Sequence, residues 1–107
     1  MTDPTHNRPL VTFALFAYNQ EEYIREAVEG AFSQTYEPLE IILSDDCSSD
    51  RTFEVMQEMT QKYRGPHLVE VRRGSRNIGV AQHFDTVMRL ANGTFVVVAA
   101  GDDISHA

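Results

Sequence analysis

The stretch TFVVVAAGDD, residues 94–103, joins the most β-prone run of the sequence to a glycine and two acids. Two earlier segments, LVTFALF at Leu10–Phe16 and LEIILS at Leu39–Ser44, are also nearly continuous apolar runs. Runs of this kind are typical of strands that are covered on both faces, as in a parallel sheet. The weaker run HLVEVR, at His67–Arg72, predicts one more strand near a sheet edge.

Between these strands, apolar residues recur at the three- and four-residue spacing of amphipathic helices. We expect helices over residues 23–32, 53–63 and 80–91. An alternation of strand and helix along the chain produces right-handed crossovers and helices on the sheet faces. The predicted fold class is therefore α/β: a Rossmann-like parallel sheet of about four strands with helices on both faces.

Local signals predict where these helices begin and end. Asn19, with Glu22 three residues later, has the spacing of a capping box at the start of the first helix. Ser49 or Asp50 can cap the second helix. Asn92–Gly93 fits a left-handed cap at the end of the third helix.

Length and charge indicate one acidic globular domain. The 107 residues suffice for one domain at most, with residues 1–9 as a lead-in and residues 10–107 as the folded part. Nine basic and sixteen acidic residues give a net charge of −7, which argues against binding to nucleic acid. The single cysteine, Cys47, excludes an internal disulfide and a cysteine-based zinc site.

The sequence also sets expectations for location. The first nine residues are polar and interrupted by proline, unlike a signal peptide, and the longest apolar run, Phe95–Ala100, is too short to span a membrane. We therefore expect a cytoplasmic protein, peripheral to the inner face of the membrane in its full-length form.

Aspartates gather directly after two of the predicted strands, at Asp45–Asp46 with Asp50 and at Asp102–Asp103. Ligands of open α/β sheets bind beyond the carboxyl ends of the strands. Gathered carboxylates repel one another, and a hard cation removes that penalty, so Mg²⁺ or Mn²⁺ fits better than zinc. Turn and helix-cap roles are the alternative; they are favoured for Asp50, equally weighted for Asp45–Asp46 and less favoured for Asp102–Asp103.

A series of short motifs resembles the family 2 glycosyltransferases, which have the GT-A fold and use nucleotide-diphosphate sugars. The resemblance covers almost the whole chain from Leu10 onward, and its specificity comes from the order and spacing of the motifs. They are AYN at 17–19, EYI at 22–24, FSQTY at 32–36, EII at 40–42 followed by DD at 45–46, RNIG at 76–79, ANGTF at 91–95 and GDD at 101–103.

This resemblance implies roles for particular residues. Tyr18 would pack along the nucleotide base, and Asp46 would accept a hydrogen bond from the base imide, which favours uracil or thymine. Asp103 would bind Mn²⁺ or Mg²⁺ as part of a DXD motif, and Asp102 would face the ribose or share the metal. The implied nucleotide-binding set is Ala17, Tyr18, Asn19, Asp46, Arg76, His83 and Asp102, and the implied metal ligands are Asp103 and Asp102.

The sequence departs from the family pattern near the expected diphosphate. Phe84 stands where many members carry an arginine, which leaves Arg73, Arg76 or His83 as its replacement. Ala100 replaces the first acid of the commonest DXD form. His83–Phe84 looks closer to a bacterial polysaccharide branch that includes rhamnosyltransferase-like members.

The resemblance also implies a reaction. The expected activity is metal-dependent, inverting transfer from a UDP- or dTDP-sugar to a hydroxyl of a glycan or lipid-linked acceptor, in polysaccharide or cell-surface glycan synthesis. The acceptor site and the catalytic base lie in the second half of the family's catalytic domain. We therefore expect no catalytic residue in this chain, a base beyond Ala107, and no sugar transfer by the isolated chain.

Two other functions fit parts of the pattern. A receiver-like phosphoacceptor domain also gathers aspartates around Mg²⁺, but it needs an acid pair after the first strand, where this sequence has Ala17-Tyr18-Asn19, and a lysine after a fifth strand. The other alternative is a non-catalytic α/β domain whose acids only cap helices. A truncated sheet leaves an exposed edge that can pair with a second copy, so homo-oligomers are a further expectation.

Overall fold

The computed structural model describes residues 8–100, and its centre is a four-stranded parallel sheet. The strands are β1 (Val11–Ala17), β2 (Leu39–Asp45), β3 (Leu68–Arg73) and β4 (Phe95–Ala100). Their order across the sheet is β3-β2-β1-β4, and every neighbouring pair is parallel. The weakest predicted strand, β3, is an edge strand, as its sequence indicated.

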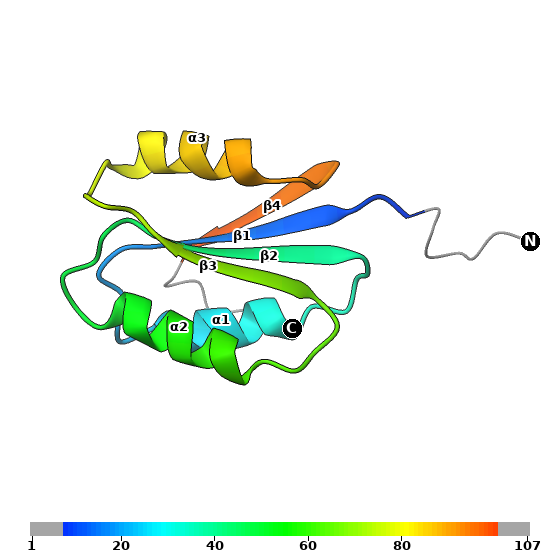
Figure 1. Cartoon of the computed structure of the whole chain (residues 1–107), viewed down its shortest axis with the longest axis horizontal. Helices are drawn as coiled ribbons and strands as arrows, with labels where there is room; N and C mark the ends of the chain where they lie inside the picture. Colours follow the sequence, from blue (N-terminus) through cyan, green and yellow to red (C-terminus); the bar gives the residue numbers. More distant parts are fainter. Residues whose placement is uncertain (1–7, 101–107) are drawn as a thin grey trace, which may run out of the picture.

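Three helices cover the two faces of this sheet. They are α1 (Ile24–Phe32), α2 (Thr52–Lys62) and α3 (Val80–Leu90). Helices α1 and α2 lie side by side on one face, and α3 lies alone on the other (Figure 1). The predicted α/β class and the helices on both faces are therefore confirmed. Within residues 8–100, no helix has the length and apolar character needed to cross a membrane.

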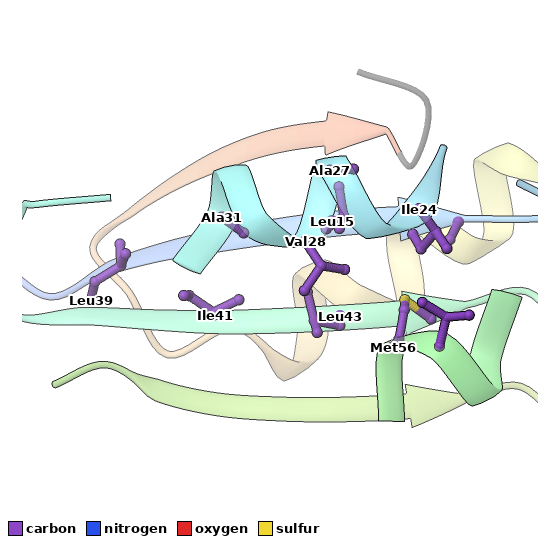
Figure 2. Packing of buried hydrophobic residues seen from close by; sticks show 11 residues of the cluster. Leu15, Ile24, Ala27, Val28, Ala31, Leu39, Ile41, Leu43 and Met56 are labelled. Carbon is purple, nitrogen blue, oxygen red and sulfur yellow. The ribbon is translucent and has the colours of Figure 1, made fainter. Parts of the chain in front are cut away.

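The larger buried cluster lies between the sheet and the α1–α2 layer. Side chains of the sheet such as Leu15, Ile41 and Leu43 join Ile24 of α1 and Met56 of α2 there (Figure 2). Each of these five side chains is at most 1% exposed. Burial of this apolar area is the main stabilising contribution to the domain.

The alternate residues of β1 and β2 point to the α3 face, where the buried cluster is smaller. It consists of Ala14, Ile42 and Val87, with partly buried neighbours around them. Because both faces of the central strands are covered, their sequences are continuously apolar instead of alternating.

The start of β4 is attached to the two central strands through a buried carboxylate. Glu40 Oε1 accepts hydrogen bonds from Thr12 Oγ1 at 2.9 Å and from the backbone N–H of Asn92 at 3.0 Å. Its Oε2 accepts from Asn92 Nδ2 at 2.8 Å. Burial alone would raise the pKa of Glu40, but the bonds from Asn92 and Thr12 outweigh it and lower that pKa below its ordinary value.

The predicted left-handed cap at Asn92–Gly93 is wrong. Ala91, the residue after α3, is extended with φ −68° and ψ 133°, so the chain leaves the helix directly toward β4. Gly93 is required for a different reason, because a Cβ there would lie 2.5 Å from the backbone nitrogen of Thr12. The glycine allows close approach to β1, not a turn.

The first helix begins later than the capping-box pattern predicts. Helix α1 starts at Ile24, after a turn in which the Gln20 carbonyl accepts from the N–H groups of Tyr23 and Ile24 at 2.9 and 2.8 Å. Asn19 is not its cap: it has φ 50°, and its Oδ1 accepts from the Ser49 N–H at 2.8 Å. A contact across 30 residues replaces the local one that the sequence suggested.

The loops after β1 and β2 are held together beyond the sheet. The Gln20 N–H donates to Thr52 Oγ1 at 2.8 Å, and the Glu21 N–H donates to Asp50 Oδ2 at 3.2 Å. Asp50 Oδ1 also accepts from the backbone N–H of Thr52, the first residue of α2, at 2.9 Å. The expected N-cap at Ser49 or Asp50 is wrong, because Arg51 is the cap residue of α2 and makes no side-chain cap hydrogen bond. Asp50 accepts from the first N–H of the helix from one position earlier, and the two loops form one connected rim.

Candidate functional site

The carboxyl ends of the strands meet at one edge of the sheet, where ligands of open α/β folds bind. One row of register partners crosses the sheet there: Arg72 in β3, Ser44 in β2, Phe16 in β1 and Ala100 in β4. Register partners in a parallel sheet share a face. This row belongs to the α3 face, because His83 of α3 contacts both Ser44 and Phe16.

A cavity of about 470 Å³ lies at this edge, a size suited to a small-molecule ligand. Aromatic rings form part of its wall: Phe16 and Phe84 stack with their centroids 5.8 Å apart, and Tyr18 is 45% exposed. Its lining comes from the ends of β1 and β4, the loop after β2 and the start of α3: Phe16, Ala17, Tyr18, Gln20, Asp46, Asn77, Gly79, Val80, His83, Phe84, Val98, Ala99 and Ala100.

Asp46 connects the cavity to the start of α3. Its backbone N–H donates to the Ala17 carbonyl at 2.9 Å, which places the residue just past the paired ends of β1 and β2. Its carboxylate accepts from the N–H of Ile78 at 2.9 Å and from that of Gly79 at 3.0 Å. A carboxylate at a helix N-terminus is favoured by the helix dipole. Each oxygen has a second lone pair, so Asp46 can still accept from a ligand.

Asp45, the neighbour of Asp46, has a different role. It is fully buried and accepts from the backbone N–H of Ser48 at 2.8 Å and from the hydroxyl of the same residue. Arg73 lies 3.8 Å away and also donates to the Ser48 carbonyl at 2.9 Å. Asp45 therefore holds the loop after β2 in place, whereas Asp46 lines the cavity. The two neighbouring acids thus have different roles.

His83 is buried and forms part of the cavity lining. Its Nε2 is 2.6 Å from Ser44 Oγ, and its ring meets Phe16 edge-on with centroids 4.9 Å apart. Burial lowers the pKa of His83 below its ordinary value, and Arg72 adds to this effect. Asp46 and Asp45 act in the opposite direction but do not cancel it. The imidazole is therefore neutral at neutral pH.

The structure brings together several of the residues expected to bind a nucleotide. Ala17, Tyr18, Asp46 and His83 all line the cavity. Asn19 and Arg76 are exposed and outside its lining, and the Asn19 side chain bonds to Ser49 instead. The expected residues Asp102 and Asp103 lie outside the described residues.

Sequence reasoning missed several residues that line the cavity. Gln20 and Asn77 supply polar groups, and Gly79 stands at the start of α3 with φ 85°, in the left-handed region that favours glycine. Asn77 and Gly79 belong to the RNIG motif, for which the resemblance implied a role of Arg76 alone. Val98 and Ala99 carry no chemical signal, and only the strand register places them here.

The cavity lining between residues 8 and 100 contains no lysine or arginine. Of the replacements considered for the family's arginine, Arg73 is committed to Asp45 and Ser48, Arg76 is outside the lining, and His83 is inside it. Nor does this part of the chain contain three or more metal-binding side chains gathered in one place.

Comparisons of sequence relate the chain to known proteins. The sequence profile of a family described as Glycosyl transferase family 2 matches residues 12–107. An uncharacterized protein of Mycobacterium tuberculosis is 41% identical over 88 residues, covering 81% of this chain and 25% of the relative. Abequosyltransferase RfbV of Salmonella typhimurium is 32% identical over 96 residues, covering 88% of this chain and 28% of the relative. The chain thus spans about a quarter of the length of these relatives.

Comparisons of structure agree with this relation. A mannosyltransferase from Pyrobaculum calidifontis, solved with GDP-Man and Mn²⁺, superposes with a TM-score of 0.85 at 25% identity, covering 96% of this chain and 30% of that one. Staphylococcus aureus TarS 1–349, solved with UDP-GlcNAc, superposes with a TM-score of 0.71 at 25% identity, covering 86% of this chain and 26% of that one.

Proposed function

The chain belongs to glycosyl transferase family 2, and we propose that its cavity binds the nucleotide diphosphate of a sugar donor. The observation that carries this proposal is the cavity at the carboxyl ends of β1, β2 and β4, lined by aromatic rings and by Asp46. The ligands named for the two solved neighbours, GDP-Man and UDP-GlcNAc, are both nucleotide sugars, which supports this ligand class.

The lining suits the two ends of such a ligand. A nucleobase can pack against Tyr18, and its imide N–H can donate to a free lone pair of Asp46. Phe16 and Phe84 extend the apolar wall for the base or ribose. Since the imide contact suits uracil and thymine, we propose a UDP- or dTDP-sugar as the donor.

A divalent cation is the second part of the proposal. Asp103, with Asp102 as partner, would hold Mn²⁺ or Mg²⁺. Carboxylate oxygens are the donor type that these hard cations prefer. The assignment of the cation to these two acids is supported by β4, which precedes them in the sequence and whose last residues, Ala99 and Ala100, line the cavity. The bound cation would neutralise diphosphate charge, a task for which the described lining supplies no lysine or arginine.

The reaction proposed for the longer protein is inverting transfer of the sugar to a hydroxyl of a glycan or lipid-linked acceptor, in polysaccharide or cell-surface glycan synthesis. An acceptor oxygen, deprotonated by a base, would attack the anomeric carbon as the nucleotide diphosphate departs from the opposite face. We place that base and the acceptor site outside this chain, so the isolated chain should bind the donor nucleotide without transferring sugar.

Calorimetric titration of the 107-residue chain with UDP, dTDP and GDP in the presence of Mn²⁺ tests the nucleotide site. We expect UDP and dTDP to bind more tightly than GDP. The Asp46→Asn substitution should weaken UDP binding by about tenfold, because a charge-assisted hydrogen bond is lost. Asp85→Asn is the matched control, since Asp85 is exposed on α3 and paired with Arg89. Absence of binding by all three nucleotides to the folded wild type would overturn the proposal.

A separate titration tests the metal assignment. Asp103→Ala should abolish the increase in UDP affinity that Mn²⁺ produces and leave the weaker, metal-free binding unchanged. A Mn²⁺ effect of the same size in Asp103→Ala would show that the cation is held elsewhere. Melting curves of each variant establish that the protein is folded in these titrations.

A further inference from the structure

A chain of polar contacts runs from the edge of the sheet to the cavity. Ser44 is fully buried in β2, and its Oγ has two polar neighbours: Arg72 Nη1 at 2.6 Å and His83 Nε2 at 2.6 Å. Arg72 is the register partner of Ser44 in β3, and His83 reaches it from α3. The three residues therefore form one contact line across the α3 face.

The direction of the hydrogen bonds in this line follows from the chemistry of the groups. A guanidinium can only donate, so Ser44 Oγ accepts from Arg72. The single hydroxyl proton of Ser44 then needs an acceptor, because a buried donor without a partner is costly. His83 Nε2 is the acceptor that the structure provides. Since Nε2 accepts, the proton of the neutral imidazole is on Nδ1.

The surroundings of His83 oppose a second proton on the ring. A protonated Nε2 would also donate to Ser44 Oγ, and two cationic donors would then share one oxygen while the hydroxyl proton lost its acceptor. Burial, the largest effect, and Arg72 lower the pKa of His83, and together they outweigh the opposite effects of Asp46 and Asp45. Together with this geometry, the lowered pKa keeps the imidazole neutral.

The Nδ1 atom is left available to a ligand. Within residues 8–100, the buried side-chain nitrogen and oxygen atoms that lack a hydrogen-bond partner are Glu54 Oε2 and His67 Nδ1. His83 Nδ1 is not one of them, so this atom is accessible from outside the protein interior. No acceptor for it is found in that part of the chain, and His83 lines the cavity.

We propose that Arg72 and Ser44 are positioning residues that fix His83 with its proton on Nδ1, and that this N–H donates to a diphosphate oxygen of the nucleotide in the cavity. The inference rests on the function proposed above and adds a recognition element to it. His83 thus supplies an uncharged donor at a site whose described lining offers no lysine or arginine.

Nitrogen-15 NMR of the histidine-labelled chain tests the positioning directly, because protonated and unprotonated ring nitrogens resonate at distinct shifts. At neutral pH we expect His83, assigned by its loss in His83→Asn, to show a protonated Nδ1 and an unprotonated Nε2. We also expect the Nδ1 resonance to shift when UDP is added. A protonated Nε2 with nucleotide binding intact would overturn the inference and leave the proposed function standing. An Nδ1 resonance that does not shift while calorimetry shows UDP binding would overturn the donation and leave the proposed function standing, whereas absence of UDP binding in the same sample would overturn the proposed function.

Two pairs of variants separate positioning from packing. Ser44→Ala and Arg72→Met each remove one link, and both should move the His83 proton toward a mixture of Nδ1 and Nε2 forms. A His83 tautomer that is unchanged in both folded variants would overturn the positioning role of Arg72 and Ser44. His83→Asn keeps an N–H near the position of Nδ1, whereas His83→Gln places its amide near that of Nε2. We expect UDP affinity to fall about tenfold or more in His83→Gln but to be largely retained in His83→Asn. The reverse order would contradict donation from Nδ1.

Discussion

At the residue scale, two glycines flanking α3 are required for different physical reasons. Gly79 has a positive φ of 85°, and a Cβ there would meet no atom within 4 Å. Gly93 has no such backbone, but its Cβ would lie 2.5 Å from the Thr12 nitrogen and 2.6 Å from Thr12 Oγ1. The first position restricts backbone conformation, and the second restricts volume.

Substitution of each glycine by alanine should separate these two costs. Gly79→Ala should lower the free energy of unfolding by about 1–2 kcal/mol, the cost of a left-handed backbone for a residue with a Cβ. Gly93→Ala should cost more, about 3 kcal/mol, because β1 and the start of β4 must move apart. Urea denaturation of both variants measures the difference. Equal losses would mean that the close approach of Gly93 to Thr12 is easily relaxed.

At the element scale, β4 depends on a residue of another strand, since Glu40 of β2 receives the hydrogen bonds that fix Asn92. The folded-state pKa of Glu40 is lowered. This contribution to stability is therefore present above the ordinary carboxyl pKa and is lost as the pH falls through the lower, folded-state value.

Glu40→Gln should lower the free energy of unfolding at neutral pH by about 1–3 kcal/mol, because the charged acceptor of the Asn92 and Thr12 bonds is lost. The difference between the variant and the wild type should shrink as the pH falls below the ordinary carboxyl pKa. Glu29→Gln, at an exposed position on α1, is the control and should change little. Denaturation at several pH values measures both, and a loss independent of pH would contradict the role of the charge.

The same elements show how far the sequence predicts this fold. The apolar runs predicted β1, β2 and β4. In β1 and β2 the signal is continuous because both faces of a central parallel strand are covered. Strand β4 is an edge strand of the described sheet, and its run includes the exposed residues Phe95, Val97 and Val98. The start of α1 could not be predicted, because Asn19 bonds to Ser49 across 30 residues and not to its own helix.

For the candidate site, the sequence predicted the location but not the contacts between its residues. Strand ends followed by acids predicted a ligand site at this edge of the sheet, and a cavity lined by Asp46 lies there. That these residues bind a nucleotide stays a prediction. The contact line from Arg72 through Ser44 to His83 was beyond sequence reasoning, because it depends on strand register and on which face each residue occupies. Such information is carried by three separate elements and appears only when they are packed together.

At the scale of the whole molecule, the two faces of the sheet are unequally buried. Helices α1 and α2 share a large cluster with one face, whereas the cluster between α3 and the other face has three fully buried residues, Ala14 and Ile42 of the sheet and Val87 of α3. Regions with few buried apolar contacts open locally at lower free energy than the rest of a domain. The cavity lies on this thinner side, next to the start of α3, so ligand binding and the docking of α3 should be coupled.

Two valines of equal burial test this coupling, since Val28 in α1 and Val87 in α3 are both 0% exposed. Either valine-to-alanine change should cost about 1–3 kcal/mol of local packing. Val28→Ala should lower global stability and leave hydrogen exchange in α3 relatively unchanged, whereas Val87→Ala should accelerate exchange mainly in α3 and weaken UDP binding. Hydrogen exchange followed by mass spectrometry, with and without UDP, measures this. Because UDP would bind where α3 meets the sheet, it should slow α3 exchange in the wild type; uniform acceleration by both variants would indicate that the two layers open together.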